Sequence, residues 1–199
     1  MRINNQKIKI FTTILILIFS LQSLVKADDI REIEIEGISI GDSLLEYMSK
    51  KKIDNAEAFF YPMSKKYKEV LIELNPEIYD QISASIEVKD NKYIIHSMMA
   101  DISFKNNFEK CEPKKKIIVN DISSILGNGV VEIQDDEYKR SADKSGKSYD
   151  ISTTFFLKNG DNIRVICTNW SEEMNAEDRL TVALNTSEFY KWLLNEAYK

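Results

Sequence analysis

The stretch Ile151-Ser-Thr-Thr-Phe-Phe-Leu-Lys-Asn-Gly-Asp-Asn-Ile-Arg-Val-Ile-Cys167 decides the fold, because it holds two alternating segments joined by a strong turn. Asn159-Gly160 is a dipeptide that favours a β-hairpin. A two-residue loop would set Phe155 opposite Arg164, whereas a three-residue loop with Gly160 in the left-handed region keeps one face apolar. We predict the second register, which pairs Phe155 with Ile163, Thr153 with Val165, and Ile151 with Cys167.

Other segments with a period of two predict further strands, and segments with a helical period predict helices. Strands are expected at residues 32–36, 82–88, 93–103, 130–133 and 180–184. A short helix is expected from Ser43, a second over residues 104–125 with a kink or break at Pro113, and a C-terminal helix capped by Asn185. Residues 54–79 give no clear pattern, and the polar residues 134–148 predict an exposed, mobile loop. The sum is a single α+β domain: a mostly antiparallel sheet with helices packed on one face and one disulfide.

The first 27 residues have the three parts of a secretory signal peptide. Arg2, Lys7 and Lys9 precede an apolar stretch from Ile10 to Leu21, which is shorter than the roughly 20 residues that a membrane span needs. We expect cleavage between Ala27 and Asp28, with residues 28–199 as the exported domain. The alternative is an uncleaved leader, which would be the chain's only association with a membrane.

The charge of the chain limits its partners. Removal of residues 1–27 takes away four of the 27 basic residues and none of the 32 acidic ones, so the formal net charge falls from −5 to −9. Nucleic acids and anionic lipids both require a positive face, so neither is an expected partner. The abundance of Ile, Lys and Asn suggests an AT-rich bacterial genome and a periplasmic or secreted location.

The chain contains two cysteines, Cys111 and Cys167, and an even number in an exported protein favours pairing. Cys111 lies on the apolar stripe of the predicted helix, and Cys167 faces the core from its strand. We therefore predict a structural disulfide between them; the alternative is two separate buried thiols.

No catalytic, cofactor or metal-binding residue is assigned. The one histidine, His96, falls on an apolar strand face with Met98, where a packed role is usual, and one imidazole cannot form a zinc site alone. The acidic runs 135–137 and 172–173 lie in predicted loops, which indicates a solvated surface. No phosphate loop, nucleophile elbow or dinucleotide fingerprint is present.

The pattern resembles small exported proteins of AT-rich bacteria that have no known activity, although it fits no named family. The resemblance is carried by the signal peptide, the Ile-Gly-Asp-Ser helix start at residues 40–43, a helix cysteine, and a strand cysteine before Asn169-Trp170. It implies no functional residue.

Three function classes stay open. The first is a non-enzymatic module that binds a protein, a peptide or a small ligand through one face of the sheet. The others are a hydrolase with two carboxylates brought together by the fold, and an inhibitor or immunity-type protein whose acidic charge steers a basic target. Aromatic residues that could contact a ligand are Tyr61, Tyr67, Tyr79, Trp170 and Trp192, of which Trp170 is expected to be the most exposed.

Overall fold

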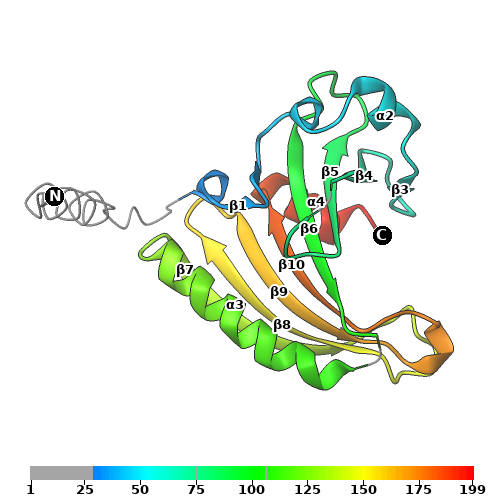
Figure 1. Cartoon of the computed structure of the whole chain (residues 1–199), viewed down its shortest axis with the longest axis vertical. Helices are drawn as coiled ribbons and strands as arrows, with labels where there is room; N and C mark the ends of the chain where they lie inside the picture. Colours follow the sequence, from blue (N-terminus) through cyan, green and yellow to red (C-terminus); the bar gives the residue numbers. More distant parts are fainter. Residues whose placement is uncertain (1–28, 75, 106) are drawn as a thin grey trace, which may run out of the picture.

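One antiparallel sheet of eight strands organises the chain, in the spatial order β3-β4-β5-β6-β10-β9-β8-β7 (Figure 1). The computed structural model describes residues 29–199 except Asn75 and Asn106, so the predicted leader and its cleavage point at Ala27 and Asp28 lie outside the described residues. The strands of this sheet are β3 (Ala58–Phe60), β4 (Tyr67–Leu71), β5 (Gln81–Glu87), β6 (Ile95–Ser103), β7 (Val130–Lys139), β8 (Tyr149–Leu157), β9 (Asn162–Asn169) and β10 (Arg179–Asn185).

A small hairpin and several helices complete the fold. The hairpin consists of β1 (Glu34–Ile35) and β2 (Ile38–Ser39), and the α-helices are α2 (Lys50–Asn55), α3 (Cys111–Leu126) and α4 (Ser187–Asn195). Short 3-10 turns are η1 (Ile30–Glu32), η2 (Leu44–Glu46), η3 (Phe108–Lys110) and η4 (Glu172–Met174). The predicted class, a single α+β domain with a mainly antiparallel sheet, is confirmed. Within the described residues, no helix is both long enough and apolar enough to cross a membrane.

The hairpin β8-β9 has the predicted three-residue loop. Its ladder pairs Phe155 with Ile163, Thr153 with Val165, and Ile151 with Cys167. Gly160 has a φ of +86°, a region that glycine enters at no steric cost. A Cβ atom at this position would also lie 2.7 Å from Ser187 Oγ, so glycine is required by packing as well as by the turn.

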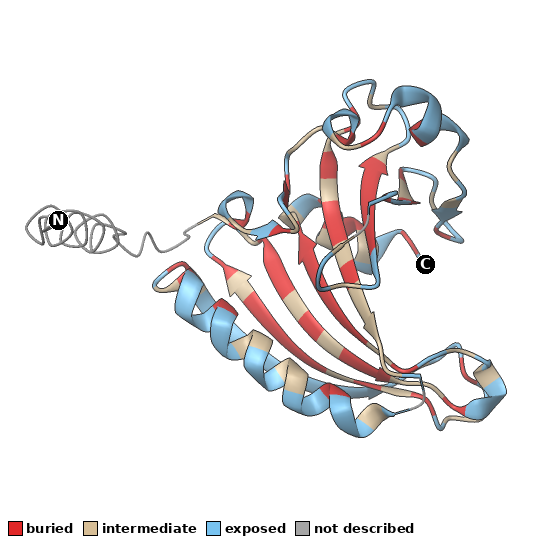
Figure 2. Cartoon of the chain, in the orientation of Figure 1, coloured by how far each residue is buried: buried red, intermediate tan, exposed pale blue. Residues whose placement is uncertain are grey.

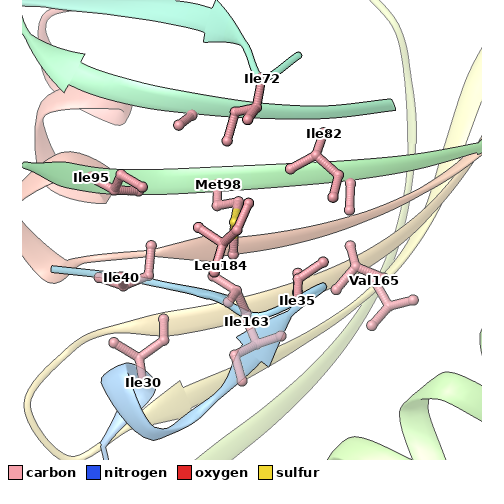
Figure 3. Packing of buried hydrophobic residues seen from close by; sticks show 14 of the residues in the cluster. Ile30, Ile35, Ile40, Ile72, Ile82, Ile95, Met98, Ile163, Val165 and Leu184 are labelled. Atoms are coloured by element: carbon pink, nitrogen blue, oxygen red, sulfur yellow. The ribbon is translucent and has the colours of Figure 1, made fainter. Parts of the chain in front are cut away.

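The main core lies between the sheet, the N-terminal segment and α3 (Figure 3). Ile30, Ile35 and Ile40 of the N-terminal segment meet Met98 and Ile163 of the sheet in one cluster of buried side chains. Buried and less buried positions alternate along parts of β6 and β9, while β5 and β10 are buried almost throughout and α3 exposes its outer side (Figure 2). A smaller cluster lies where α4 meets the sheet and contains Tyr61, Tyr67, Phe189, Trp192 and Ala197.

Helix α3 is one continuous helix, so the predicted kink at Pro113 is wrong. Pro113 is the third residue of α3. The first N–H groups of a helix have no partner within the helix, so a proline in the first turn sacrifices no hydrogen bond. Gly127, at the other end, adopts a φ of +54° and ends the helix.

His96 is not on the core face that the alternation predicted. The β5-β6 ladder pairs Ser85 with Ser97 but Ile86 with Ile95, so His96 is an extra residue in a bulge. The bulge moves the imidazole against the ring of Tyr67, at 5.2 Å between centroids. A single extra residue inverts the alternation beyond it, which is why a strict period of two failed here.

Three other boundaries differ from those predicted. Residues 134–139 extend β7 instead of forming a mobile loop, because β8 offers them a complete ladder. Ser43 does form a capping box, but it opens only the turn η2, and α2 begins separately after its own cap, Ser49. Helix α4 is capped by Thr186, because Asn185 still belongs to β10.

The predicted disulfide is confirmed. Cys111 and Cys167 are bonded and fully buried, with their Cα atoms 5.8 Å apart. The bond joins the first residue of α3 to the middle of the sheet, and it closes a loop with a sequence separation of 56. No free cysteine is left.

Reduction of the disulfide should strongly destabilise the domain. In the chain-entropy model a loop of this length contributes about 4 kcal/mol to the free energy of unfolding, so urea should unfold the reduced protein at a much lower concentration. Intact mass with and without reductant checks the bond, since reduction adds two hydrogen atoms. Alkylation of both thiols in the denatured, unreduced protein would contradict it.

Candidate ligand-binding face

The face of the sheet that points away from the main core carries mainly polar side chains, many of them short. In β8, for example, Phe155 and Leu157 enter the core, so Ser152 and Thr154 point the other way. The same alternation in the neighbouring strands places further polar side chains on this surface, which we call the polar face, with Met99, Phe156, Ile166 and Ala183 among them: Glu69, Ser83, Ser85, Ser97, Asp101, Asp150, Ser152, Thr154, Asn162, Arg164, Thr168, Arg179, Thr181 and Asn185.

Much of the polar face is shielded from solvent. Ser152 is 1% exposed and Asn162 is fully buried. The side chains are short, and the long strands that carry them are curved in Figure 1, with α3 running along the outer side of the curve. Neighbouring residues therefore cover them, so each polar atom here carries a desolvation cost unless it has a partner.

A line of hydrogen bonds crosses the polar face from β6 to β9, at the end where β10 leads into α4. Ser97 Oγ donates to Asn185 Oδ1 at 2.8 Å, and Asn185 Nδ2 donates to Asn162 Oδ1 at 3.0 Å. The three residues stand opposite one another on β6, β10 and β9. Asn162 Nδ2, at the end of this line, has no protein partner although it is buried.

Two carboxylates lie on the β4 to β10 side of the face. Ser83 Oγ donates to Glu69 Oε1 at 2.7 Å, and Thr181 Oγ1 donates to Asp101 Oδ1 at 2.5 Å. Arg179 Nη1 lies 3.6 Å from Asp101 Oδ2. Burial raises the pKa of Glu69, and the negative charge of Asp101 acts in the same direction.

Two further arginines lie on the β7 to β9 side. Arg140 donates twice through Nη1 to the buried Asp150, at 2.9 and 2.7 Å, and its guanidinium stacks over Trp170 at 4.3 Å from the ring centre. Arg164 Nη2 donates to Tyr138 Oη at 3.0 Å. Burial raises the pKa of Tyr138, so this hydroxyl is neutral at physiological pH.

Arg164 differs from Arg140 and Arg179 because it has no carboxylate partner. Among the described residues, no Asp or Glu oxygen forms an ion pair with its guanidinium within 4.0 Å. Its Nε and the nearby Ser152 Oγ are both buried and have no hydrogen-bond partner in the protein. Asp136 stands opposite Ser152 on β7, but its side chain is exposed. Arg164 is thus a half-buried cation whose counter-charge is missing.

The two ends of the polar face are well ordered. At one end, α4 packs Trp192 and Phe189 against Tyr67, with ring centres 4.8 and 5.1 Å apart from it. At the other, the loop after β7 folds around Asp143, whose carboxylate accepts from the backbone N–H and the hydroxyl of both Ser145 and Ser148. These bonds tie the loop between β7 and β8 to the Asp143 carboxylate.

The residues singled out from the sequence are mostly not on this face. Tyr61, Tyr67 and Trp192 pack in the smaller core cluster, and Trp170 is half-buried beneath Arg140 instead of freely exposed. The acidic runs 135–137 and 172–173 are exposed, the first in β7 and the second in η4. Within the described part of the chain, no group of three or more His, Cys, Asp or Glu residues is placed to hold a metal ion.

The sequence did not predict the polar face, because the strands were inferred from their apolar positions and the polar positions between them were assumed to be solvated. In β8, β9 and β10 most positions between core residues are polar, and they include Ser152, Thr154, Asn162, Arg164 and Thr181. A solvated strand face usually carries long charged side chains, so a run of Ser, Thr and Asn was a readable signal of a buried polar surface.

Comparisons with known proteins do not extend this description. Neither a protein-family model, nor a curated protein sequence, nor a solved structure matches the chain. The functional argument therefore rests on the geometry of the polar face.

The arrangement offers two kinds of chemistry. A carboxyl group with a raised pKa can donate a proton, and with a second carboxylate such as Asp101 it could form the acid-base pair of a hydrolase. The unpaired donors around Arg164 can instead bind an acceptor or an anion. Glu69 and Asp101 are each already engaged by a hydroxyl group of the face, whereas Arg164 is the group that lacks a counter-charge.

The raised pKa of Glu69 predicts a pH-dependent effect of Glu69→Gln. Unfolded glutamate loses its proton near pH 4.3, before the folded group does, so Glu69 destabilises the native state increasingly as the pH rises above that value. Gln keeps the acceptor for Ser83 but carries no charge. In urea titrations, the free energy of unfolding of the variant should exceed that of the wild type, and this difference should be larger at pH 7 than at pH 4.

The control for this prediction is Glu57→Gln, because Glu57 is an exposed carboxylate in the loop before β3. Its effect on the urea midpoint should be small and should not grow between the two pH values. A Glu69→Gln effect of equal size at pH 4 and pH 7 would contradict the assignment.

Proposed function

We propose that the chain is an exported, non-enzymatic binding module that takes a small anionic ligand, such as a carboxylate or a phosphate ester, on the polar face. The observation that carries the proposal is the unpaired Arg164, together with the buried and unpartnered Asn162 Nδ2 and Ser152 Oγ on the same face. A buried group without a partner costs about 1–3 kcal/mol, so a ligand that supplies the missing acceptors gains part of this energy.

An anion suits this surface better than a neutral ligand. The unpaired atoms of Arg164, Asn162 and Trp170 are all N–H donors, and donors favour acceptor groups. The guanidinium of Arg164 has a fixed fork of donors that matches a carboxylate or a phosphate. Binding is favoured over hydrolysis because Glu69 and Asp101 already accept hydrogen bonds from Ser83 and Thr181.

Ligand retention tests this function. The full chain, purified under native conditions from an envelope fraction or culture medium, should carry a small anionic molecule that native mass spectrometry resolves. Arg164→Gln should reduce the bound fraction at least about tenfold, because a charge-assisted hydrogen bond contributes about 1.5–3 kcal/mol. Arg31→Gln is the matched control, since Arg31 is 65% exposed and lies off the polar face.

The alternatives give different outcomes. A second pocket of about 370 Å³ is lined by Arg31, His96 and Thr186 among others, so a ligand lost from the Arg31 variant alone would place binding there. A neutral ligand, or a ligand retained fully by Arg164→Gln, would contradict the role of Arg164. Recovery of no ligand from any native preparation would count against the binding function itself.

The proposed location is the periplasm or the extracellular space, reached by cleavage of residues 1–27. Supporting features are the leader pattern and a disulfide, a bond that persists in oxidising compartments. N-terminal sequencing of the exported protein should therefore begin at Asp28. A mature protein that still starts at Met1 would contradict cleavage.

A further inference from the structure

The strand β7 forms one edge of the eight-stranded sheet, so one side of its backbone has no strand partner. It contains ten residues, whereas β3 at the opposite edge contains three. Nine of the ten residues of β7 are exposed, and Val130 is half-buried. A long, exposed edge is a template for a further strand unless something protects it.

Apolar side chains accompany this open edge. Val131 and Ile133 of β7 are 59% and 54% exposed. A pocket of about 460 Å³ lies between α3 and β7, lined by residues that include Lys115, Val119, Asp135 and Ile151. An added strand would thus find both backbone groups and apolar side chains to pack on.

The acidic side chains of β7 favour an added strand that carries basic side chains. Residues 130–139 contain four acidic side chains, Glu132, Asp135, Asp136 and Glu137, and one basic side chain, Lys139. Asp135 accepts a hydrogen bond from Thr153, which in turn accepts from Lys115, so one acid is satisfied internally. No described residue forms an ion pair with Glu132, Asp136 or Glu137 within 4.0 Å.

A second copy of the chain is a poor match for this edge. Two β7 strands related by a two-fold axis run antiparallel, and a register centred on the strand sets Glu132 of each copy opposite Glu137 of the other. Like charges directly across a ladder are destabilising. A strand with basic side chains would form favourable cross-strand pairs at the same positions.

We propose that β7 is an interaction edge that adds an extended, basic segment of another protein as a ninth strand. The backbone of the segment supplies the ladder, and its Lys or Arg side chains pair with Glu132 and Asp136. Its apolar side chains pack beside Val131 and Ile133. The added ladder would form on the open backbone edge of β7 and does not use Arg164, although Glu132 and Asp136 lie on the same side of the sheet as Ser152 and the polar face.

A designed peptide tests the proposal. The probe is a ten-residue peptide of alternating Lys and Val with a fluorescent label, titrated with the full disulfide-bonded protein and followed by anisotropy. Saturable binding that weakens with added salt is expected. The double variant Glu132→Lys/Asp136→Lys should weaken the affinity about tenfold or more, because two attractive cross-strand pairs become repulsive.

Two controls make the result specific to the edge. Glu172→Lys/Glu173→Lys makes the same change of charge on the exposed turn η4, away from β7, and should bind the peptide as the wild type does. A matched peptide of alternating Glu and Val should not bind. Circular dichroism of each variant confirms that the fold is intact.

Three outcomes would overturn the proposal. They are the absence of saturable binding by the Lys-Val peptide, equal weakening by the η4 double variant, and a stable dimer of the free protein that Glu132→Lys/Asp136→Lys dissociates in sedimentation experiments. The last result would assign β7 to a second copy of the chain.

Discussion

The register of the β8-β9 hairpin is the constraint on which the rest of the structure depends. Gly160 allows a three-residue loop, and that loop decides which side chains of β8 and β9 enter the core. A slip by one residue would exchange the two faces of a strand, burying Arg164 in the apolar cluster and exposing Ile163 and Val165. The same turn also holds α4, because Asp161 Oδ1 accepts from the backbone N–H of Ser187.

This register produces two unlike faces from one short sequence. One face meets α3 and the N-terminal segment with branched apolar side chains, and the other presents Ser, Thr, Asn and Arg. The polar face is shielded but incompletely paired, which is a costly arrangement for a purely structural surface. Function in natural proteins is often found where such local rules are broken, and here the break centres on Arg164.

The sequence predicted the hairpin from the dipeptide Asn159-Gly160, and it predicted the disulfide from two cysteines in a chain whose leader pattern predicts export. It failed at His96, where a single bulged residue inverted the alternation, and at Pro113, where the position within the helix decided its effect. It also assigned residues 134–139 to a loop, because a strand without a buried side chain carries no apolar pattern. The sequence did not predict the polar face as one surface, because its residues lie on β4, β5, β6, β8, β9 and β10 and are brought together only by the pairing of strands that are distant in the sequence.

The disulfide has a mechanical consequence for β7. Cys111 and Cys167 close a covalent ring that includes α3, β7 and β8, and both ends of the ring are anchored in the buried core. A force applied to β7 by a bound segment therefore pulls on a closed ring. The edge strand can be peeled from β8 over a limited distance, but the chain on either side of it cannot be drawn out past the two cysteines while the bond is oxidised.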